Sequence, residues 1–205
     1  MGNCTVIVTG ASGSCYGLRL IDQLVLAGHD VATVFTDAGR EVTAFELGFE
    51  LPTGDAAVAA AALAAFLELP SAEKLRVAYP DQLFDALASG SHRTDAMIVA
   101  PCSMGFVAAV ANGLADNLPQ RAADVMLKER RPLVLVPRET PLSLIHLRNL
   151  TSAAEAGAII VPAMPAFYTK PQSVDDLVSF VVGKVLDVLD VEHHLFKRWG
   201  DSPGA

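Results

Sequence analysis

The sequence predicts an α/β fold, a single flavodoxin-like or Rossmann-like domain whose parallel sheet is covered by helices on both faces. Short runs rich in β-forming residues alternate with longer segments of helical periodicity, a pattern typical of parallel sheets. Two of the short runs, residues 6–8 and 97–99, are continuously apolar, as strands buried on both faces require. A chain of 205 residues is long enough for one domain with a complete core.

Each expected strand is a short apolar or β-branched run that is followed by turn residues or by a helical segment. In chain order the strands are residues 4–9, 31–36, 75–79, 96–100, 133–136 and 158–161. The helices expected between and after them are residues 15–27, 38–46, 56–67, 103–112, 121–128, 142–156 and 174–189. The last helix has the clearest start, because Ser173 precedes it and Asp175 and Asp176 suit its positive end. We expect the domain to span residues 1–191 and a loose C-terminal tail to span residues 192–205.

Composition and charge exclude several classes of function. A net charge of −8 argues against broad binding to nucleic acid or to an anionic membrane surface. Pro101, Ser103 and Asn112 interrupt the uncharged stretch 96–115, so we expect no membrane span there. Three cysteines without metal-like spacing, and no secretory signal, indicate a reducing cytoplasm and no metal site. A chain that is 52% hydrophobic and only 19% charged is expected to bury apolar surface against copies of itself.

The first strand runs directly into a glycine-containing loop that opens a helix, residues 9–17 (TGASGSCYG). Glycines let the backbone approach a ligand, and free amides at a helix start attract phosphate. The dinucleotide fingerprint fails, because Ser12 and Cys15 stand where it requires glycine, and no Gly-Lys pair of a P-loop follows. We therefore expect a general phosphate-binding or mononucleotide-binding loop, with a tight turn that binds nothing as the alternative.

Two further strand ends carry polar residues that could meet a ligand. After the fourth strand come residues 101–106 (PCSMGF), where Ser103 suits the N-cap of the next helix, a role that would explain it without a ligand. Cys102 is expected to be a buried thiol, because no neighbouring cation activates it. Thr36 could bind a ribityl or phosphate oxygen or simply form a turn. Glu46 could transfer protons if apolar neighbours raise its pKa, although a solvated helix face is the simpler interpretation.

The most informative segment is residues 128–141 (KERRPLVLVPRETP), in which a buried-looking strand runs into Arg138 and Glu139. The strand ends of an open parallel sheet are where ligands bind in such folds. Arginine binds phosphate through two parallel hydrogen bonds, so we expect Arg138 in an anion-binding crevice. Glu139 could be a salt-bridge partner of Arg138 or an acid–base group. Arg121 and Lys128 belong to the same basic part of the chain, where a solvated helix surface would explain some of the cations.

Tyr168 lies in a loop after the sixth strand, where its hydroxyl could bind an anion and its ring could line an apolar pocket. The histidines indicate little chemistry. His146 is expected to pack on a helix rather than to act in catalysis. Residues 192–194 (EHH) are expected to be solvated, because no third ligand has the spacing of a metal site.

With these features in place, the chain resembles the UbiX-type flavin prenyltransferases, a flavodoxin-like family of homomeric flavin-containing enzymes. The resemblance extends from residue 9 to residue 199. It is carried by residues 9–13 (TGASG), 100–103 (APCS), 121–124 (RAAD), 127–140, 165–173 and 198–199 (RW). The block from Lys128 to Glu139 is its most specific part. Thr36 stands where such enzymes usually have serine, and Lys184 where they commonly have arginine.

The resemblance implies transfer of a dimethylallyl group from dimethylallyl monophosphate to N5 and C6 of reduced FMN, with no metal. The product, prenylated FMN, would serve a UbiD-type decarboxylase, and the enzyme would be a cytoplasmic homo-oligomer, as a dodecamer. The FMN positions that it implies are Gly10, Ala11, Ser12, Thr36, Ser103, Met104, Gly105, Phe106 and Arg121. The donor-phosphate positions are Lys128, Arg138, Tyr168 and Lys184, and the positions for proton movement are Ser12, Glu46 and Glu139. Several of these residues would meet only across subunits.

Two other functions remain open for this fold. An FMN-dependent decarboxylase acting on a peptidyl or pantothenoyl cysteine would need a histidine near a strand end, and His146 is the only candidate. A non-catalytic flavin carrier is the second alternative. A carrier has no need of an acid such as Glu139 beside a phosphate-binding Arg138.

Overall fold

Six strands form one parallel sheet in the computed structural model, which describes residues 2–200. The strands are β1 (Asn3–Val8), β2 (Asp30–Phe35), β3 (Leu75–Ala78), β4 (Ala96–Cys102), β5 (Leu133–Pro137) and β6 (Ile159–Ile160). Their order is β3-β2-β1-β4-β5-β6, and each neighbouring pair is parallel. This is the strand order of a Rossmann sheet, in which the winding reverses between β1 and β4. The predicted fold class and strands are confirmed, with β6 shorter than expected.

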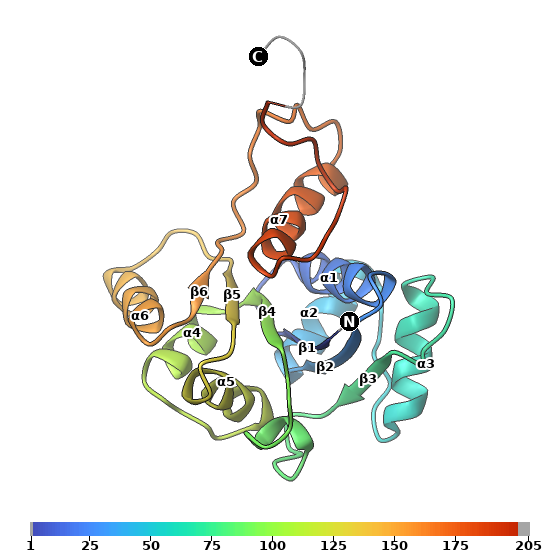
Figure 1. Ribbon diagram of the computed structural model, residues 1–205, viewed down its shortest axis with the longest axis vertical. Helices are drawn as coiled ribbons and strands as arrows, with labels where there is room; N and C mark the ends of the chain where they lie inside the picture. Colours follow the sequence, from blue (N-terminus) through green and yellow to red (C-terminus); the bar gives the residue numbers. More distant parts are fainter. Residues whose placement is uncertain (1, 201–205) are drawn as a thin grey trace.

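Seven α-helices and one short 3₁₀-helix connect these strands within the described residues (Figure 1). They are α1 (Ser14–Leu26), α2 (Asp37–Leu47), α3 (Ala56–Phe66), η1 (Ala86–Ala88), α4 (Met104–Ala111), α5 (Leu118–Lys128), α6 (Leu144–Glu155) and α7 (Val174–Val188). The predicted helices are confirmed. However, α5 begins at Leu118 instead of residue 121, because Asn117 caps it and Pro119 suits its first turn. Among the described residues, no helix is both long enough and apolar enough to cross a membrane.

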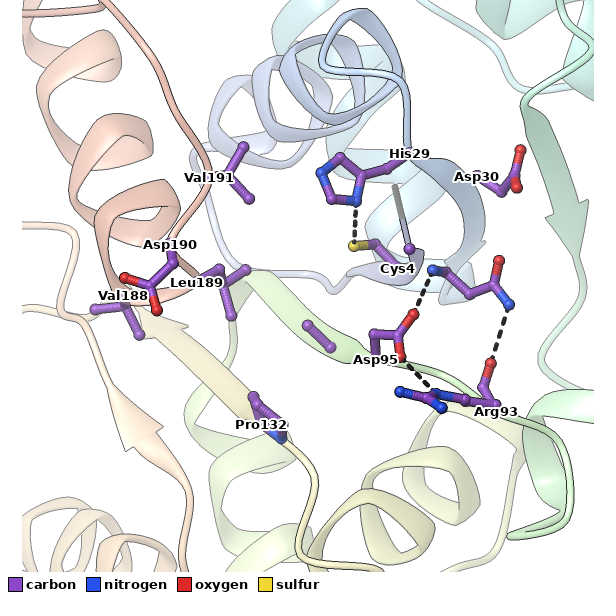
Figure 2. Close-up of a pocket in the computed structure, with 13 residues that line it drawn as sticks. Cys4, His29, Asp30, Arg93, Asp95, Pro132, Val188, Leu189, Asp190 and Val191 are labelled. Atoms are coloured by element: carbon purple, nitrogen blue, oxygen red, sulfur yellow. Dashed lines mark hydrogen bonds and ion pairs between the residues drawn. The ribbon is translucent and has the colours of Figure 1, made fainter.

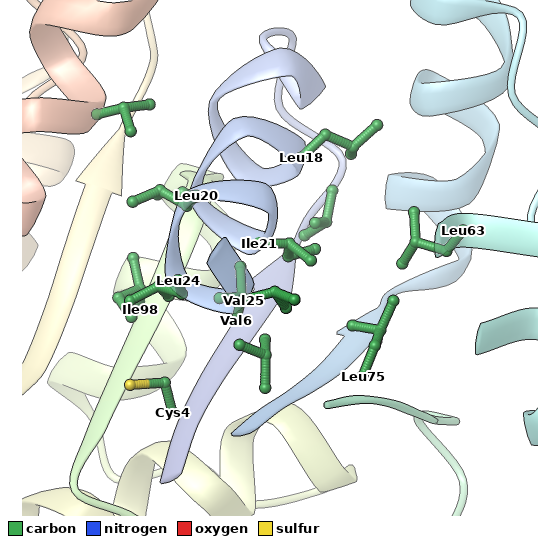
Figure 3. Packing of buried hydrophobic residues seen from close by; sticks show 14 of the residues in the cluster. Cys4, Val6, Leu18, Leu20, Ile21, Leu24, Val25, Leu63, Leu75 and Ile98 are labelled. Atoms are coloured by element: carbon green, nitrogen blue, oxygen red, sulfur yellow. The ribbon is translucent and has the colours of Figure 1, made fainter. Parts of the chain in front are cut away.

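Apolar side chains pack on both faces of the sheet and hold its strands in place. One core cluster lies under α1, α3 and α7, and the other lies under α4, α5 and α6. On the first face Leu20, Ile21 and Leu24 of α1 are fully buried near Val6 and Ile98 (Figure 3). These helix positions recur at helical spacing and so form one apolar stripe. Burial of each such side chain contributes about 1.5–3 kcal/mol, which fixes the strand ends that carry the candidate site.

Glycines allow two helices to start directly against the strand ends. A Cβ on Gly17 of α1 would lie 2.2 Å from the carbonyl oxygen of Ala100 in β4. A Cβ on Gly39 of α2 would lie 2.3 Å from the carbonyl oxygen of Val8 in β1. Any side chain at these two positions would push α1 or α2 away from the sheet. At the carboxyl edge of the sheet, α1 and α2 therefore pack directly against the backbone of the central strands.

The chain after β6 forms an arm that projects beyond the sheet, composed of residues 162–173, α7 and residues 189–200 (Figure 1). Its two irregular segments are packed together by aromatic rings. The Tyr168 ring meets the rings of Phe180 and Trp199 edge-on, at centroid distances of 5.9 and 5.1 Å. Phe196 lies 4.9 Å from Phe180. His193 and Phe196 thus dock the last described segment on α7, while the side chains of Glu192 and His194 are solvated. Residues 201–205 of the predicted tail lie outside the described residues.

Candidate active site

Thr9 joins the ends of the two central strands at the point where the winding reverses. Its hydroxyl donates to the carbonyl oxygen of Pro101 at 2.7 Å and accepts from the amide of Ser103 at 2.8 Å. The residue is buried. Ligands bind at this reversal point in open α/β sheets, so Thr9 sets the geometry of the candidate site. The sequence pattern indicated only a glycine loop here, and a hydroxyl at the very end of the first strand is the signal that was missed.

Glu46 of α2 occupies the amino terminus of α1. Its carboxylate accepts hydrogen bonds from the amide of Gly13, at 3.0 and 3.1 Å to its two oxygens, and from the amide of Ser14 at 3.0 Å. The Ser12 side chain also bonds to it. Partial burial raises the pKa of Glu46, but these hydrogen bonds and the nearby Arg138 outweigh it and lower the pKa below its usual value.

Both sequence-based interpretations of Glu46 are therefore wrong. Glu46 does not lie on a solvated helix face, and its pKa is lowered rather than raised, because the donors of the loop outweigh its apolar neighbours. Within the glycine loop, the amides of Gly13 and Ser14 are taken by the Glu46 carboxylate. The anion at the positive end of α1 belongs to the chain itself. Ionised Glu46 is suited to accept a hydrogen bond from the Ser12 hydroxyl and so to orient it, and it is unsuited to donate a proton.

Arg138 leaves the end of β5 and reaches the same loop. Its amide donates to the carbonyl oxygen of Cys102 at 3.3 Å, and its side-chain Nε donates to the carbonyl oxygen of Ser12 at 2.9 Å. None of the ion pairs within residues 2–200 includes Arg138, so its two terminal nitrogens can face an anion. The predicted position of Arg138 in the crevice at a strand end is matched by this geometry.

Glu139 lies beside Arg138 at the exposed mouth of the crevice. Its carboxylate accepts a hydrogen bond from the amide of Thr140 at 3.0 Å. Within the part of the chain that the structure describes, it forms no ion pair with Arg138. The salt-bridge interpretation of Glu139 is thus wrong for the single chain, and a carboxylate that can exchange protons remains.

Two helix amino termini flank the crevice on its other sides. Thr36 caps α2 by accepting from the amide of Gly39 at 3.0 Å, and Ser103 caps α4 by accepting from the amide of Phe106 at 3.3 Å. A Cβ on Gly105 would meet only the Ser103 hydroxyl, at 4.0 Å, so the space beside this backbone is open. Hydroxyls, helix-start amides and an open surface fit the polar chain and flat ring of FMN.

Three of the expected FMN positions can contribute only limited surface. Met104, Phe106 and Ala11 are 6%, 6% and 7% exposed, because they pack into the core. Gly10 is needed for a different reason, since a Cβ there would lie 2.5 Å from the Cβ of Ala38 at the start of α2.

Arg121 and Lys128, both on α5, lie away from this crevice within the chain. Arg121 pairs with Asp124 at 2.6 Å and donates to the carbonyl oxygen of Ala88 at 3.2 Å. Lys128 pairs with Glu129 beside the loop that leads into β4. That loop lies at the amino edge of the sheet, whereas Arg138 follows the carboxyl end of β5. Lys128 and Arg138, both candidates for binding the donor phosphate, therefore lie at opposite edges of the sheet in a single chain.

Tyr168 and Lys184 are both on the arm. The Tyr168 ring packs between Phe180 and Trp199, and Lys184 Nζ lies 3.1 Å from Asp187 Oδ2. No contact within the described residues joins either of them to Arg138. One chain thus brings Ser12, Glu46, Arg138 and Glu139 together at the crevice. Lys128, Tyr168 and Lys184 lie outside that crevice in the same chain.

A cavity of about 620 Å³ opens at the amino edge of the sheet, away from the crevice (Figure 2). Cys4 Sγ lies 3.7 Å from Nδ1 of His29 in this cavity. Burial, with the nearby Asp95 carboxylate, raises the pKa of the Cys4 thiol to about 11, so it stays protonated at neutral pH. Among the described residues, no group of three or more histidine, cysteine or acidic side chains could hold a metal ion. This cavity therefore has no activated nucleophile.

The Rossmann-type sheet and the polar crevice at its reversal point define a nucleotide-binding α/β protein. A family model described as Flavoprotein matches residues 2–186. The chain is 46% identical over 203 residues to flavin prenyltransferase UbiX of Halalkalibacterium halodurans, covering 98% of this chain and 95% of that protein. It belongs to the UbiX family of flavin prenyltransferases.

Solved structures of relatives share the whole fold. AnUbiX, crystallised with FMN and dimethylallyl pyrophosphate, has a TM-score of 0.86 and 37% identity, covering 98% of this chain and 99% of that one. A dodecameric FMN-dependent UbiX-like decarboxylase from Escherichia coli O157:H7 has a TM-score of 0.83 and 38% identity, covering 96% and 98%. The match extends across the crevice and the arm alike.

Proposed function

We propose that this protein is a flavin prenyltransferase, which joins a dimethylallyl group to N5 and C6 of reduced FMN and so makes prenylated FMN. The observation that carries the proposal is the cluster of Ser12, Glu46, Arg138 and Glu139 at the reversal point of a chain 46% identical to a UbiX enzyme. An arginine for an anionic leaving group and a carboxylate for a proton are what this transfer needs.

When bound, reduced FMN supplies the electron-rich ring atoms that accept the allylic carbon. The chain binds and orients this group with the hydroxyls of Thr36 and Ser103 and with nearby backbone amides. Gly105 leaves room for the flat ring. The backbones of Gly10, Ala11, Ser12, Met104 and Phe106 complete this surface, and Arg121 of a neighbouring subunit supplies a cation.

Arg138 binds the phosphate of the dimethylallyl donor through its terminal nitrogens. Positive charge there stabilises the phosphate as its bond to the allylic carbon breaks, which lowers the barrier to ionisation. Lys128, Tyr168 and Lys184 act on the same phosphate after assembly, because neighbouring subunits bring them to it. A dodecamer is the proposed assembly, and it is supported by the dodecameric relative.

Ser12 and Glu46 act as one unit in this scheme. The ionised Glu46 carboxylate holds the Ser12 hydroxyl and the start of α1 in place, so that the hydroxyl is oriented toward the crevice. Glu139 stands at the mouth and accepts the proton that leaves C6 when the new ring closes. A carboxylate with solvent access can then return this proton to water.

Four finer points belong to the same proposal. The donor is dimethylallyl monophosphate, the product passes to a UbiD-type decarboxylase, and the enzyme acts in the cytoplasm. Residues 1–191 form the flavoprotein domain, and residues 192–205 form its C-terminal segment. The relative crystallised with dimethylallyl pyrophosphate makes the phosphate count the first of these to test.

Mass spectrometry of the flavin tests the function directly. The protein is incubated without oxygen with reduced FMN and either dimethylallyl monophosphate or dimethylallyl pyrophosphate. We expect the flavin to become heavier by one C5H8 unit with the monophosphate. Arg138→Ala should bind FMN but transfer at least about 100-fold more slowly, because charge stabilisation of the leaving group is lost. An unchanged flavin mass with both donors, beside an active UbiX enzyme, would overturn the proposal.

The cysteine decarboxylase alternative finds no support in the geometry. It needs a histidine at the crevice, but the ring of His146 accepts from the amide of Ser143 in the capping box of α6. The carrier alternative predicts that Arg138→Ala is as effective as the wild type in supporting a partner decarboxylase. Measuring the flavin mass with Arg138→Ala therefore separates a carrier from a prenyltransferase.

A further inference from the structure

Asp187, on the last turn of α7, gathers three basic side chains around one carboxylate. Lys184 Nζ lies 3.1 Å from Oδ2, while Arg198 Nη2 and His193 Nε2 lie 2.7 and 3.0 Å from Oδ1. Partial burial raises the pKa of Asp187, but the hydrogen bonds from Arg198, Lys184 and His193 outweigh it and lower the pKa to about 2. The carboxylate is therefore ionised at any pH at which the protein works.

His193 acts here as a hydrogen-bond donor to the carboxylate. Its Nδ1 accepts from the amide of Leu195 at 3.3 Å, so the ring proton is on Nε2 and points at Asp187. Its side chain is 2% exposed, unlike those of its neighbours Glu192 and His194, which are solvated as predicted. Two cations, Lys184 and Arg198, thus share the Asp187 carboxylate.

The segment that carries His193 and Arg198 lies directly on α7. A Cβ on Gly183 would be 2.5 Å from the Phe196 ring and 2.7 Å from the His193 ring, so this glycine lets the segment touch the helix. Farther along the segment, Trp199 packs edge-on against Tyr168. Of the two arm residues proposed to bind the donor phosphate, Tyr168 is therefore held by Trp199 of this segment, and Lys184 shares the Asp187 carboxylate with its His193 and Arg198.

We infer that Asp187 is a positioning residue for the donor phosphate: it holds Lys184 and Arg198 side by side as one cationic site and anchors the segment that supports Tyr168. The inference rests on the proposed function, in which Lys184 and Tyr168 bind that phosphate. It adds Arg198 as a second cation at this place and gives Asp187 and His193 a role.

The physical reason lies in the choice of lysine at residue 184. A lysine ammonium is a point charge on a flexible chain and imposes no geometry of its own, unlike an arginine fork. Two neighbouring cations also repel each other unless a carboxylate lies between them. Asp187 removes both problems before the ligand arrives, because it orders the lysine in advance and neutralises one of the two charges.

The test compares Asp187→Asn with Asp190→Asn in FMN-loaded protein. Asp190 is exposed, three residues further along, and within residues 2–200 its side chain forms no hydrogen bond or ion pair. We expect Asp187→Asn to raise KM and calorimetric Kd for dimethylallyl monophosphate about tenfold, with kcat, FMN affinity and Tm nearly unchanged. Asp190→Asn should leave all of these values at the wild-type level. Equal losses in FMN affinity and Tm would mean a merely structural role and would overturn the inference.

A double-mutant cycle shows whether Asp187 acts through Lys184. In a Lys184→Met background, Asp187→Asn should weaken donor binding less than about twofold further, because the cation that it positions is gone. Fully additive losses, or tighter donor binding by Asp187→Asn alone, would refute positioning. Asp187→Glu, which keeps the charge and moves it by one methylene, should fall between wild type and Asp187→Asn, and it serves if the asparagine variant does not fold.

Calorimetry separates this inference from the proposed function. Donor binding to FMN-loaded protein needs no turnover, so Asp187 can be judged even if no prenylated flavin forms. If the wild type transfers the prenyl group and Asp187→Asn is indistinguishable from it, only the positioning role is refuted.

Discussion

Glu46 receives hydrogen bonds from two backbone amides and from the Ser12 side chain. A neutral carboxylic acid accepts such bonds less strongly, so folding favours the ionised form and the pKa is lowered. The linkage has a definite sign. A lowered pKa gives stability that is fully present above the ordinary glutamate pKa and is lost as the pH falls through the lowered value.

Glu46→Gln should therefore destabilise the protein at pH 7 and much less in acid. The amide keeps the shape of the side chain but loses the charge that the start of α1 binds. After allowance for its partial exposure, we expect a loss of about 1 kcal/mol at pH 7, or about 3 °C in Tm, and slower prenyl transfer. Thermal melts at pH 7 and in mild acid check this. Glu41→Gln, an exposed change on the same helix, is the control, and a pH-independent difference would contradict the charge argument.

At the scale of elements, Thr9 links β1 to the segment that follows β4. Both partners of its hydroxyl are backbone groups, the carbonyl of Pro101 and the amide of Ser103. Ser103 in turn caps α4, so a single buried hydroxyl connects two strands and a helix start. The spacing of the crevice depends on this connection more than on the side chains that line it.

Thr9→Val should weaken both the fold and the binding of FMN. It leaves the amide of Ser103 without its partner and leaves the Pro101 carbonyl with only the longer bond from the Thr9 amide, at 3.3 Å. We expect a cost of about 1–3 kcal/mol. Thr33→Val is a matched control, because the Thr33 hydroxyl also donates to a carbonyl in the sheet, that of Val6 at 2.9 Å, but away from the crevice. Chemical unfolding and FMN titration measure the two effects. If Thr33→Val lowered FMN affinity equally, the loss would be one of general stability.

The sequence pattern predicted the elements well, because strands buried on both faces and amphipathic helices leave clear periodicities. It was less successful at element ends, where capping decides, as with Asn117 and α5. Ser12, Arg138 and Glu139 could be grouped beforehand, since the carboxyl ends of parallel strands share one edge.

Contacts between residues distant in the chain could not be predicted in the same way. The bond of Glu46 to the amides of Gly13 and Ser14 depends on how α2 packs beside α1, which no local pattern encodes. The burial of His193 depends likewise on Gly183, whose missing side chain admits the last segment onto α7. The functional roles came from resemblance to a family and not from periodicity.

At the scale of the whole molecule, the ligands for the donor phosphate are dispersed. Arg138 follows the carboxyl end of β5, and Lys128 precedes its amino end. The arm exposes large apolar side chains, including Phe167 at 72%, Val174 at 75% and Trp199 at 74%. Exposed apolar surface of this kind is typical of sites where copies of a protein associate. Assembly would cover the arm and bring Lys128 of one subunit to Arg138 of another.

Mixing two inactive variants tests this arrangement. Lys128→Ala and Arg138→Ala proteins should each be nearly inactive, but subunits exchanged by mild unfolding and refolding of the mixture should regain up to about a quarter of the wild-type activity. In such assemblies some sites receive an intact Lys128 and an intact Arg138. A mixture of Lys128→Ala with Lys128→Met is the control and should stay inactive. No recovery in the first mixture would place both residues in the same subunit's site.

The placement of Lys128 and Arg138 at opposite edges of one sheet has a consequence for heredity in the proposed assembly. A cell that carries two damaged alleles, one altered at each position, would still make some working sites, so the alleles would complement each other within one gene. A single allele altered at Arg138 and expressed beside a normal one would lower activity only in proportion to its share of the subunits. An allele altered at both positions would lower it more steeply, because each defective copy would then inactivate its own site and a neighbour's.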